Sequence, residues 1–483
     1  MSLKLVVIGA GPGGYQAAIR AAQLGARVSL VEQAQVGGTC LHRGCIPTKT
    51  LKATAQALEE AHRLHEFGIT SSGQFQADLM AINARKQQVI DTQTQGIAKL
   101  LQAWGVELVC GRACLDGPQA VEVELAGGGR ARLEAERLIL ASGSRPADLP
   151  GLARDGEAVL NSDDALLLKE IPGRLLIVGG GVVGCEFAFI YAALGSQVTL
   201  VEALDRLLPM PSLDAEASRL LQRELKKRGV KVHIGRMVGE LKREPGGLEA
   251  RLDPSPLLLP PAKGKTPPPI TVAADQVLVS VGRALNSDGL GLAEAGLSLE
   301  RGAVQVDGRL AAGPQGVYAV GDVLGTGRPM LAHMAGAEAR VAAANALGAN
   351  LTVDYRAVPA VAFTTPEVAW VGLSPEQAAA QGLQAAGHLF QMRALGKAQA
   401  MGELAGFCKL LSEQPSGRLL GATIVGAQAS AMIHECALAL KLGATVVDLA
   451  HTIHAHPTLS EAVAETADLA LDQCLHAPPP KKG

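Results

Sequence analysis

The sequence predicts an α/β protein that contains two parallel-sheet units and a separate C-terminal α+β unit. Three observations lead to this prediction. Two segments, 5–32 and 175–202, repeat the same order of apolar strand, glycine-rich turn, helix and second strand. The chain has 483 residues, which is enough for three domains at roughly 150 residues each. From about residue 351 onward, apolar periodicity continues without another glycine-rich turn.

The first repeat has the pattern of a Rossmann-like unit that binds a dinucleotide. An apolar strand at 5–8 is followed by a glycine turn, a helix to about Leu24, and a second strand that ends at Glu32. The fingerprint glycines of the turn are Gly9, Gly11 and Gly14. Glycines there permit a tight turn, close approach of the backbone to a pyrophosphate, and close packing of helix on strand. The pyrophosphate would lie at the helix N-terminus, where free N–H groups and the helix dipole favour an anion.

The second repeat has the same plan, with a strand at 175–178, a helix to about Leu194 and a strand that ends at Glu202. Its fingerprint glycines are Gly179, Gly181 and Gly184. In both repeats the acid follows the last glycine by 18 residues. A carboxylate at that place can accept hydrogen bonds from a ribose 2′-hydroxyl and would repel a 2′-phosphate, so Glu202 favours NAD over NADP. A solvated carboxylate at a strand end is the alternative interpretation.

Composition and charge exclude several classes of partner. The net charge is -2 and aromatic residues make up only 3% of the chain, so neither a basic surface nor stacking platforms for nucleic acid are expected. No apolar run reaches the roughly 18 to 20 residues that span a bilayer, because Glu186 interrupts the run 175–195. Eight cysteines are too sparse for a secreted disulfide scaffold. We therefore expect a cytoplasmic protein that binds neither nucleic acid nor membrane.

The rest of the chain can be divided around the two repeats. A proline-rich stretch, 253–269, excludes a central strand or helix and predicts a surface loop within the second unit. Strand-like residues follow at Gln276–Val281, and a short strand ends in a Gly-Asp turn at Gly321 and Asp322. The predicted domains are a first nucleotide-binding domain in two parts, 1–150 and 275–350, a second at 151–274, and a C-terminal domain at 351–483.

Two cysteines, Cys40 and Cys45, lie shortly after the first repeat in the sequence Gly-Gly-Thr-Cys-x4-Cys-x-Pro. A disulfide across so short a loop would contribute only ~2 kcal/mol by the loop-entropy estimate, so structural stapling explains it poorly. The pattern favours a redox-active pair. Two alternatives are a metal site, for which only His42 is available as a further ligand nearby, and two unrelated buried thiols.

Near the C-terminus, His456 precedes a proline and is followed closely by Glu461. A histidine whose tautomer and orientation are fixed by a carboxylate suits a general base. Taken alone this pattern also fits an ordinary loop histidine. Together with the cysteines it becomes informative, because a substrate thiol must lose a proton before it attacks a disulfide.

The combination of these motifs resembles the pyridine-nucleotide disulfide oxidoreductases over nearly the whole chain. The resemblance rests on the cysteine motif, the two fingerprints in this order, Ala141-Ser142-Gly143-Ser144-Arg145-Pro146, Val320-Gly321-Asp322 and His-Pro-Thr-x-Ser-Glu. Within the family, four further runs are most similar to the members that oxidise dihydrolipoamide with NAD. These are the Leu after Cys40, 330–333, 365–369 and 433–435.

The resemblance implies two cofactors, FAD and NAD, and no metal. FAD would be bound by Gly9, Gly11, Gly14, Glu32, Gly38, Thr39, Lys49, Ala113, Ser142, Gly143, Asp322, Met330, Leu331, Ala332 and His333. NAD would be bound by Gly179, Gly181, Gly184, Glu186, Glu202, Val238 and Gly282. In this scheme Glu32 contacts the adenosine ribose, Lys49 lies near flavin N5, and Glu186 lies near the nicotinamide.

The resemblance also implies how the chemistry is divided. Cys40 would be the thiol that exchanges with substrate, and Cys45 the thiol that touches the flavin. His456, oriented by Glu461, would be the base and would come from the other subunit, so that the active site exists only in a homodimer. The expected substrate is dihydrolipoamide on the lipoyl domain of an acyltransferase or carrier protein, as in 2-oxo-acid dehydrogenase complexes.

The sequence departs from the family pattern at several places. His42 and Arg43 replace the Asn and apolar residue that are common between the cysteines, and Thr48 stands where Ser is frequent. An added cation near Cys40 is expected to lower a thiol pKa. The stretches 253–269 and 393–397 also differ from the usual pattern. These differences concern fine specificity rather than the reaction class.

Other members of the family, and one other class, are weaker alternatives. A glutathione reductase would use NADP and carry arginines after the second fingerprint, where this chain has Glu202-Ala203. A mercuric reductase usually has two adjacent cysteines at the C-terminus, where this chain has only Cys474. A soluble transhydrogenase would lack the first cysteine of the pair. A non-catalytic flavoprotein subunit of a larger complex would not require the cysteines, His456 and Glu461 together.

Overall fold

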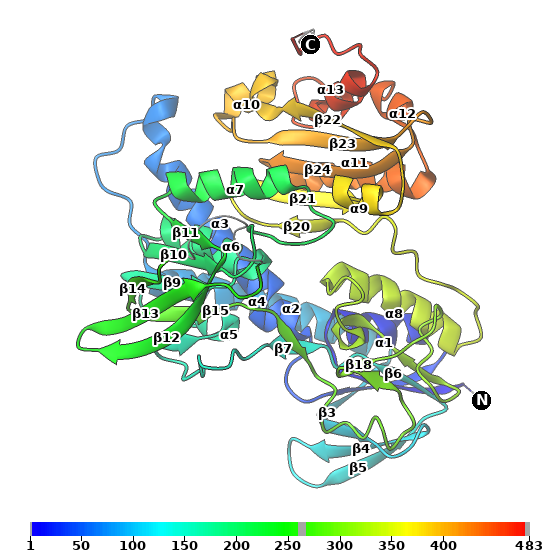
Figure 1. Cartoon of the computed structure of the whole chain (residues 1–483). Coiled ribbons are helices and arrows are strands. Elements are labelled where there is room, and N and C mark those ends of the chain that lie inside the picture. Colours follow the sequence, from blue (N-terminus) through cyan, green and yellow to red (C-terminus); the bar gives the residue numbers. More distant parts are fainter. Residues whose placement is uncertain (1, 259–266, 479–483) are drawn as a thin grey trace.

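The computed structural model describes residues 2–258 and 267–478 as three units that surround a common centre (Figure 1). The first unit contains the N-terminus, and helix α8 (Ala332–Ala346) returns to it from late in the chain. The second unit, drawn in green, carries the second glycine fingerprint, and the C-terminal unit lies across the top of the view. The arrangement agrees with the predicted α/β units followed by an α+β unit.

The first unit is built on a seven-stranded sheet in the order β19-β6-β1-β2-β3-β4-β5. Its strands are β1 (Lys4–Ile8), β2 (Arg27–Glu32), β3 (Glu107–Leu115), β4 (Ala120–Leu125), β5 (Arg130–Glu134), β6 (Arg137–Leu140) and β19 (Val317–Ala319). Strands β19, β6, β1, β2 and β3 pair in parallel, whereas β4 and β5 extend the sheet as antiparallel strands. Helices α1 (Pro12–Gln23) and α8 pack against each other. Strands β1, β6 and β19 are almost entirely buried and mainly apolar, as is usual for parallel strands covered on both faces, whereas β3 is partly exposed.

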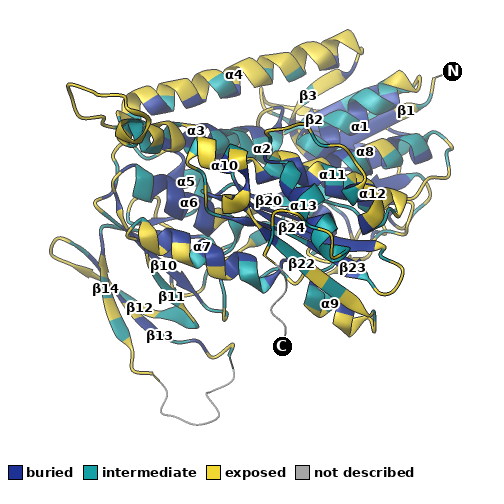
Figure 2. Ribbon diagram, turned by 90° about the horizontal axis from the view of Figure 1, so that it is seen from above, coloured by how far each residue is buried: buried dark blue, intermediate teal, exposed yellow. Residues whose placement is uncertain are grey.

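The second unit contains a fully parallel sheet in the order β11-β10-β9-β15-β8. Its strands are β8 (Val159–Leu160), β9 (Arg174–Val178), β10 (Gln197–Glu202), β11 (Lys231–Ile234) and β15 (Gln276–Val279). Helix α6 (Val182–Ala193) is apolar on nearly all sides and is buried in the centre of the molecule, as Figure 2 shows. Helix α7 (Ala215–Lys227), in contrast, has an exposed polar face. Since β15 lies in this sheet, we propose that the second unit extends to Val279 rather than ending at residue 274.

The predicted loop 253–269 connects two strands of a small antiparallel sheet in the second unit. This sheet consists of β12 (Arg236–Glu244), β13 (Gly247–Pro254) and β14 (Ile270–Ala274). The first two residues of the predicted loop, Asp253 and Pro254, belong to β13. A proline is tolerated at Pro254 because it lies at the end of the strand, where a backbone N–H is not needed. Residues 259–266 of the loop lie outside the described residues.

Three helices between β2 and β3 carry the cysteine motif and the connection to the second unit. They are α2 (Gly38–Arg43), α3 (Cys45–His62) and α4 (Leu79–Ala103), with a short 3-10 helix, η1 (Leu64–Phe67), before α4. Helix α3 packs against α6 of the second unit. Helix α4 lies at the periphery with most of its residues exposed (Figure 2). The cysteine motif is thereby placed where the first two units meet.

The C-terminal unit is an antiparallel sheet in the order β20-β21-β24-β23-β22. Its strands are β20 (Ala360–Ala362), β21 (Glu367–Gly372), β22 (Ala385–Gln391), β23 (Phe407–Glu413) and β24 (Leu419–Gly426). Helices α11 (Ala429–Leu442) and α13 (Glu461–Ala470) pack on it, and α9 (Pro375–Ala380), α10 (Gly396–Met401) and α12 (Val446–Ala450) are shorter. In the described part of the chain, no helix combines the length and apolarity needed to cross a membrane.

Candidate active site

A cavity of about 1640 Å³ lies where the three units meet. Its wall includes the first glycine turn, the cysteine motif, the N-terminus of α6, and side chains of the C-terminal unit such as Phe363 and His434. Ligand pockets usually measure about 300 to 1,000 Å³. The cavity is therefore large enough for an extended ligand, and it reaches from the first glycine fingerprint to the first turn of α6, at Val182, Val183 and Glu186.

The first fingerprint is shaped for close contact between backbone and ligand. Gly11 caps α1 without any side-chain hydrogen bond, so the N–H groups of the first helical turn are left for another acceptor. Gly9 and Gly11 line the cavity, whereas Gly14 lies behind them. A Cβ atom on Gly14 would be only 1.7 Å from the carbonyl oxygen of Gly9. Glycine at this position is what lets the helix start directly against the strand end.

The acids that end the two repeats have the same hydrogen bonds. Glu32 accepts hydrogen bonds from the backbone N–H groups of Ala10, at 2.6 Å, and Ala34, at 2.8 Å. Glu202 accepts the equivalent bonds from Gly180, at 2.6 Å, and Leu204, at 2.8 Å. Each carboxylate is thus held against the second residue of its own glycine turn. The duplication seen in the sequence extends to individual atoms.

A second wall of the cavity is formed by the 141–146 segment and the Gly-Asp turn. The hydroxyl of Ser142 is buried there and has no hydrogen-bond partner within the described residues. Asp322 accepts a hydrogen bond from the hydroxyl of Ser144. Arg283 donates to the Ser144 carbonyl at 2.8 Å and lies 3.7 Å from the Asp322 carboxylate. A buried hydroxyl without a partner indicates a polar ligand at this wall.

The two cysteines face each other as a dithiol in this structure, Cys40 within α2 and Cys45 as the first residue of α3. The Cys40 thiol donates a hydrogen bond to the sulfur of Cys45, and together with burial this raises the pKa of Cys40 well above its ordinary value. The same hydrogen bond, helped by the charge of Lys49, lowers the pKa of Cys45 to about 7 although burial opposes the shift. Cys45 is therefore the thiolate of the pair near neutral pH, and Cys40 keeps its proton.

Lys49 and Glu186 form an ion pair that joins the first two units. The Lys49 ammonium donates to both carboxylate oxygens of Glu186, at 2.9 and 2.8 Å. The ammonium also lies 4.5 Å from the centre of the Phe363 ring. The backbone N–H of Phe363 donates a hydrogen bond to Glu186 at 2.9 Å. Since the Glu186 side chain is almost fully buried, the pair is strongly oriented. The cysteine helix α3, the buried helix α6 and the C-terminal unit are thus connected at one point.

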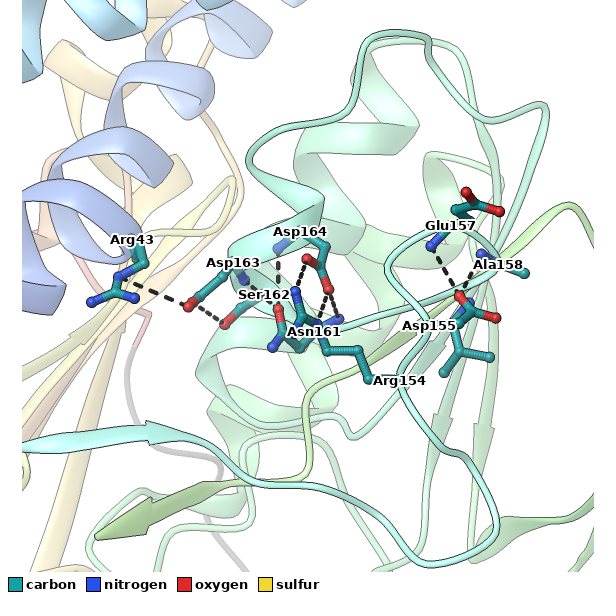
Figure 3. Close-up of polar contacts among 10 residues, drawn as sticks. Arg43, Arg154, Asp155, Glu157, Ala158, Asn161, Ser162, Asp163 and Asp164 are labelled. Atoms are coloured by element: carbon teal, nitrogen blue, oxygen red, sulfur yellow. Dashed lines mark hydrogen bonds and ion pairs between the residues drawn. The ribbon is translucent and has the colours of Figure 1, made fainter. Parts of the chain in front are cut away.

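The unusual residues between the cysteines contact groups other than the thiols. Arg43 lies 4.0 Å from Asp163 at the start of α5 (Ser162–Ala165) in the second unit, as Figure 3 shows. Burial raises the pKa of Asp163, and the charge of Arg43 opposes this. A ring nitrogen of His42 lies 2.8 Å from the carbonyl oxygen of Val36. The cation that lowers the pKa of Cys45 is Lys49, whereas Arg43 serves as a contact between two units.

His456 and Glu461 form a dyad at the surface of the C-terminal unit. The Nδ1 atom of His456 lies 2.8 Å from one oxygen of Glu461, and the Thr458 N–H donates to the other at 2.8 Å. Burial opposes ionisation of Glu461, but these hydrogen bonds outweigh it and keep its pKa below the ordinary value. The His456 side chain is 76% exposed, and neither member of the dyad lines the cavity.

The structure brings together most of the residues that the sequence suggested for FAD. The cavity is lined by Gly9, Gly11, Glu32, Gly38, Thr39, Lys49, Ala113, Ser142, Gly143, Asp322, Met330, Leu331, Ala332 and His333. Of the residues suggested for NAD, only Glu186 lines this cavity. The others lie outside its wall: Gly179, Gly181, Gly184, Glu202, Val238 and Gly282. Gly179 follows β9 and Glu202 ends β10, at the carboxyl edge of the second sheet, which is where open α/β sheets bind ligands.

Several residues of the site were not singled out from the sequence. Arg283, Phe363 and Asp163 lie more than 100 residues from their partners Ser144, Glu186 and Arg43. A single sequence gives no signal for contacts of this kind, because Arg283, Phe363 and Asp163 belong to no motif in their own segments. The sequence motifs singled out the candidate groups, and the fold adds residues that contact them.

Comparison with known proteins places the whole chain in one family. Residues 3–339 match the profile described as pyridine nucleotide-disulphide oxidoreductase, and residues 358–467 match its dimerisation domain. A dihydrolipoyl dehydrogenase of Thermus scotoductus is 42% identical over 474 residues, which cover 98% of each chain. A dihydrolipoyl dehydrogenase of Chlamydia muridarum is 40% identical over 480 residues, which cover 99% of this chain and 98% of that protein.

Solved structures give the same result. The crystal structure of LpdA from Mycobacterium tuberculosis is 29% identical, has a TM-score of 0.86, and matches 97% of this chain and 99% of that one. The flavoprotein disulfide reductase RclA from Escherichia coli is 27% identical, with a TM-score of 0.82, and matches 96% and 99% of the two chains. The resemblance that the motifs suggested is thereby confirmed. The chain belongs to the pyridine nucleotide-disulphide oxidoreductase family, with both the nucleotide-binding part and the dimerisation domain present.

Proposed function

We propose that this protein oxidises dihydrolipoamide to lipoamide with NAD+ as the acceptor, through FAD and a redox-active Cys40–Cys45 disulfide. The observation that carries the proposal is the placement of Cys40, Cys45 and Lys49 together in the wall of the cavity that the first fingerprint lines. The charge of Lys49 helps to lower the pKa of Cys45 to about 7. Such a cysteine pair suits disulfide exchange, because Cys45 is a good leaving group and Cys40 can be attacked. The relatives named dihydrolipoyl dehydrogenase, similar over nearly their full length, support the choice of substrate.

The residues present fit both cofactors. The glycine turn against α1, the carboxylate of Glu32 and the unpartnered hydroxyl of Ser142 line one cavity with the cysteines, as a bound FAD requires. The matching turn at Gly179–Gly184 and Glu202 suits NAD. When bound, FAD would accept two electrons from the dithiol, and NAD+ would accept them as a hydride.

The protein residues then handle the thiols and protons. His456 takes the proton of one substrate thiol, and the resulting thiolate attacks Cys40 in the disulfide, so that the bond to Cys45 breaks and Cys45 leaves as a thiolate. Lys49 stabilises the charge on Cys45. The second substrate thiol then gives up its proton and attacks the substrate sulfur that is bound to Cys40, which forms the disulfide of lipoamide, and Cys40 leaves and takes up that proton. One substrate dithiol has then been exchanged for one enzyme dithiol.

The proposal includes a homodimer in which His456 serves the partner's cysteines. His456 does not line the cavity of its own chain, and α13 lies in the C-terminal unit, far from α2 in Figure 1. Large apolar side chains are exposed on the same unit, and Ile453, three residues before His456, is 98% exposed. Leu438, Leu442 and Val447 are among the others. An exposed apolar surface next to a base without a nearby substrate is expected at a subunit interface.

The proposed physiological substrate is dihydrolipoamide attached to a lipoyl domain of an acyltransferase or carrier protein. The direct test compares reduction of NAD+ by dihydrolipoamide with turnover of glutathione, NADPH and mercuric ion by the same preparation. Dihydrolipoamide with NAD+ should give the highest kcat/KM. A higher value for glutathione with NADPH, or for mercuric ion, would contradict the proposal.

The place of Glu202 predicts a strong preference for NADH over NADPH. Replacing Glu202 with Ala removes a hydrogen bond to the ribose and the repulsion of a 2′-phosphate, so the ratio of kcat/KM values should fall by roughly tenfold or more. Glu202→Gln is the matched variant, because it removes the charge but keeps an acceptor for Gly180 or Leu204. Equal kinetics with both nucleotides in the unmodified protein would be inconsistent with the NAD assignment.

The role of Lys49 predicts a shift in the titration of Cys45. In Lys49→Met the cation is lost and the charge of Glu186, which raises the pKa of Cys45, acts unopposed. The midpoint of thiolate formation, followed by ultraviolet absorption of the reduced protein against pH, should therefore move upward from about 7. Lys52→Met is the control, because Lys52 lies one turn along α3 and pairs with Glu367. The same midpoint in Lys49→Met and the control would show that Lys49 does not stabilise the thiolate.

A further inference from the structure

Glu338 is a buried carboxylate just behind the cavity wall, and none of the sequence motifs includes it. It lies in α8 and is only 2% exposed. One of its oxygens accepts a hydrogen bond from the Gly321 N–H at 2.7 Å, and the other accepts one from the Tyr355 hydroxyl at 2.8 Å. Burial raises the pKa of Glu338, although these two hydrogen bonds oppose the shift. A buried acid is tolerated only when its oxygens are well partnered, as they are here.

The direction of these hydrogen bonds is fixed by Arg328 in the cavity wall. Its guanidinium donates to the Tyr355 hydroxyl at 2.9 Å and lies 5.3 Å from the centre of the Tyr355 ring. Arginine has no acceptor, so the Tyr355 proton must be donated onward to Glu338. Glu338 in turn receives donors on both oxygens, which favours its ionised form. A chain of charge-assisted hydrogen bonds therefore runs from Arg328 through Tyr355 and Glu338 to the backbone of Gly321.

The Gly321–Asp322 turn is held by side chains from two separate segments. Glu338 of α8 accepts a hydrogen bond from the Gly321 N–H, and the Ser144 hydroxyl donates one to the Asp322 carboxylate. Gly321 has a φ of +77°, and a Cβ there would lie 3.3 Å from the Cβ of Ala335. Gly321 thus has a backbone conformation that other residues rarely adopt, and the hydrogen bonds from neighbouring groups keep the turn in its place.

Tyr355 comes from outside the nucleotide-binding part of the chain. It lies between the two family matches, which end at residue 339 and begin at residue 358. The start of the dimerisation domain also contacts α8, where a ring nitrogen of His333 lies 2.8 Å from the carbonyl oxygen of Pro359. The segment that leads to the dimerisation domain is thus fixed to the helix that carries Glu338.

We propose that Glu338 and Tyr355 are positioning residues of the flavin site, which hold the Gly321–Asp322 turn through the hydrogen-bond chain that begins at Arg328. The inference rests on the proposed binding of FAD in this cavity. It adds Glu338, which lies behind the cavity wall, and Tyr355, whose hydroxyl links Arg328 to Glu338, and both act through the Gly321–Asp322 turn. Loss of Glu338 leaves the Gly321 N–H and the Tyr355 hydroxyl without this acceptor, and loss of the Tyr355 hydroxyl leaves one oxygen of the buried Glu338 carboxylate without its donor. In either case the turn relaxes away from the place that the cofactor needs.

The test measures the rate at which FAD leaves the purified holoenzyme, followed by the rise in flavin fluorescence on dilution. Tyr355→Phe and Glu338→Gln should each release FAD about 10- to 100-fold faster than the unmodified protein, as expected when a buried charge-assisted hydrogen bond is lost. The double variant should release FAD at about the rate of the faster single variant, and not at the product of the two single effects. The reason is that both changes break the same chain of hydrogen bonds. The visible circular dichroism of bound FAD should change in the same variants.

Tyr318→Phe is the matched control. Tyr318 is buried, whereas Tyr355 is half-buried, and the Tyr318 hydroxyl donates to the carbonyl of Asn345 at the other end of α8, at 3.1 Å. This variant loses a phenol hydrogen bond to the same helix but should retain FAD like the unmodified protein. Thermal unfolding of the FAD-free proteins separates positioning from general stability, since Tyr355→Phe and Tyr318→Phe should then melt at similar temperatures.

The outcomes separate this inference from the proposed function. If the unmodified protein binds no FAD, the proposed function itself fails. If it binds FAD, and Tyr355→Phe releases it at the rate of Tyr318→Phe, the positioning role is overturned while the function stands. A Tyr355→Phe variant that is less stable without FAD, but releases FAD no faster, would also overturn it, because the residue would then be merely structural.

Discussion

Replacing Cys45 with Ser is expected to reduce lipoamide turnover below detection and to remove the long-wavelength absorption that a thiolate gives next to oxidised flavin. Serine cannot form the disulfide, and its hydroxyl does not ionise near neutral pH. Cys40→Ser should also lose turnover, since the disulfide is again impossible. It should keep the absorption band, because a serine hydroxyl can still donate the hydrogen bond that lowers the pKa of Cys45. The two variants therefore differ in spectrum although both are inactive.

Cys110→Ser is the control for this experiment, because Cys110 is exposed on β3 and does not line the cavity. Its absorption and turnover should match those of the unmodified protein. The roles of the two cysteines would have to be exchanged if Cys40→Ser lost the band and Cys45→Ser kept it. A Cys45→Ser variant with both the band and lipoamide turnover would refute the redox role altogether.

The two glycine repeats could be predicted from the sequence because their information is local. The predicted strands 5–8 and 175–178 each begin one residue late, and both helices end within a residue of the prediction. A buried parallel strand, a turn that only glycine can make, and a helix follow each other within about 30 residues. The acids Glu32 and Glu202 are part of the same pattern, so their hydrogen bonds are duplicated as well.

Other parts of the fold depend on contacts that no single segment contains. The strand at 276–279 was recognised as a strand, but its place in the second sheet depends on pairing with β9, about 100 residues earlier. The contact between Glu338 and Tyr355 joins a helix to a connecting segment with no motif of its own. The role of Arg43 was expected to involve the thiols, yet its partner is Asp163. Such contacts follow from tertiary packing, and the periodicity and spacing of residues in one sequence carry no information about them.

The exposed His456 leads to the second large expected effect. His456→Gln should lower lipoamide turnover by about two to four decades, which is the usual contribution of a general base. Reduction of the flavin by NADH should be unchanged, because that step involves no substrate thiol. The control is His476→Gln, since His476 is likewise exposed and pairs with Glu465 of α13 at 2.7 Å. Equal losses in the two half-reactions would mean that His456 supports the structure rather than the proton transfer.

A mixture of two inactive variants tests whether the base comes from the partner subunit. Cys45→Ser and His456→Gln are combined under conditions in which subunits exchange, with exchange verified by a mass tag on one variant. If the base acts across the interface, each mixed dimer contains one site with both changes and one with neither, so activity should return to at most about half of that of an unmodified dimer. If the cysteines and His456 act within one chain, every site keeps one change. No recovery after verified exchange would therefore exclude the shared active site, even though the exposed dyad and the separate cavity both favour it.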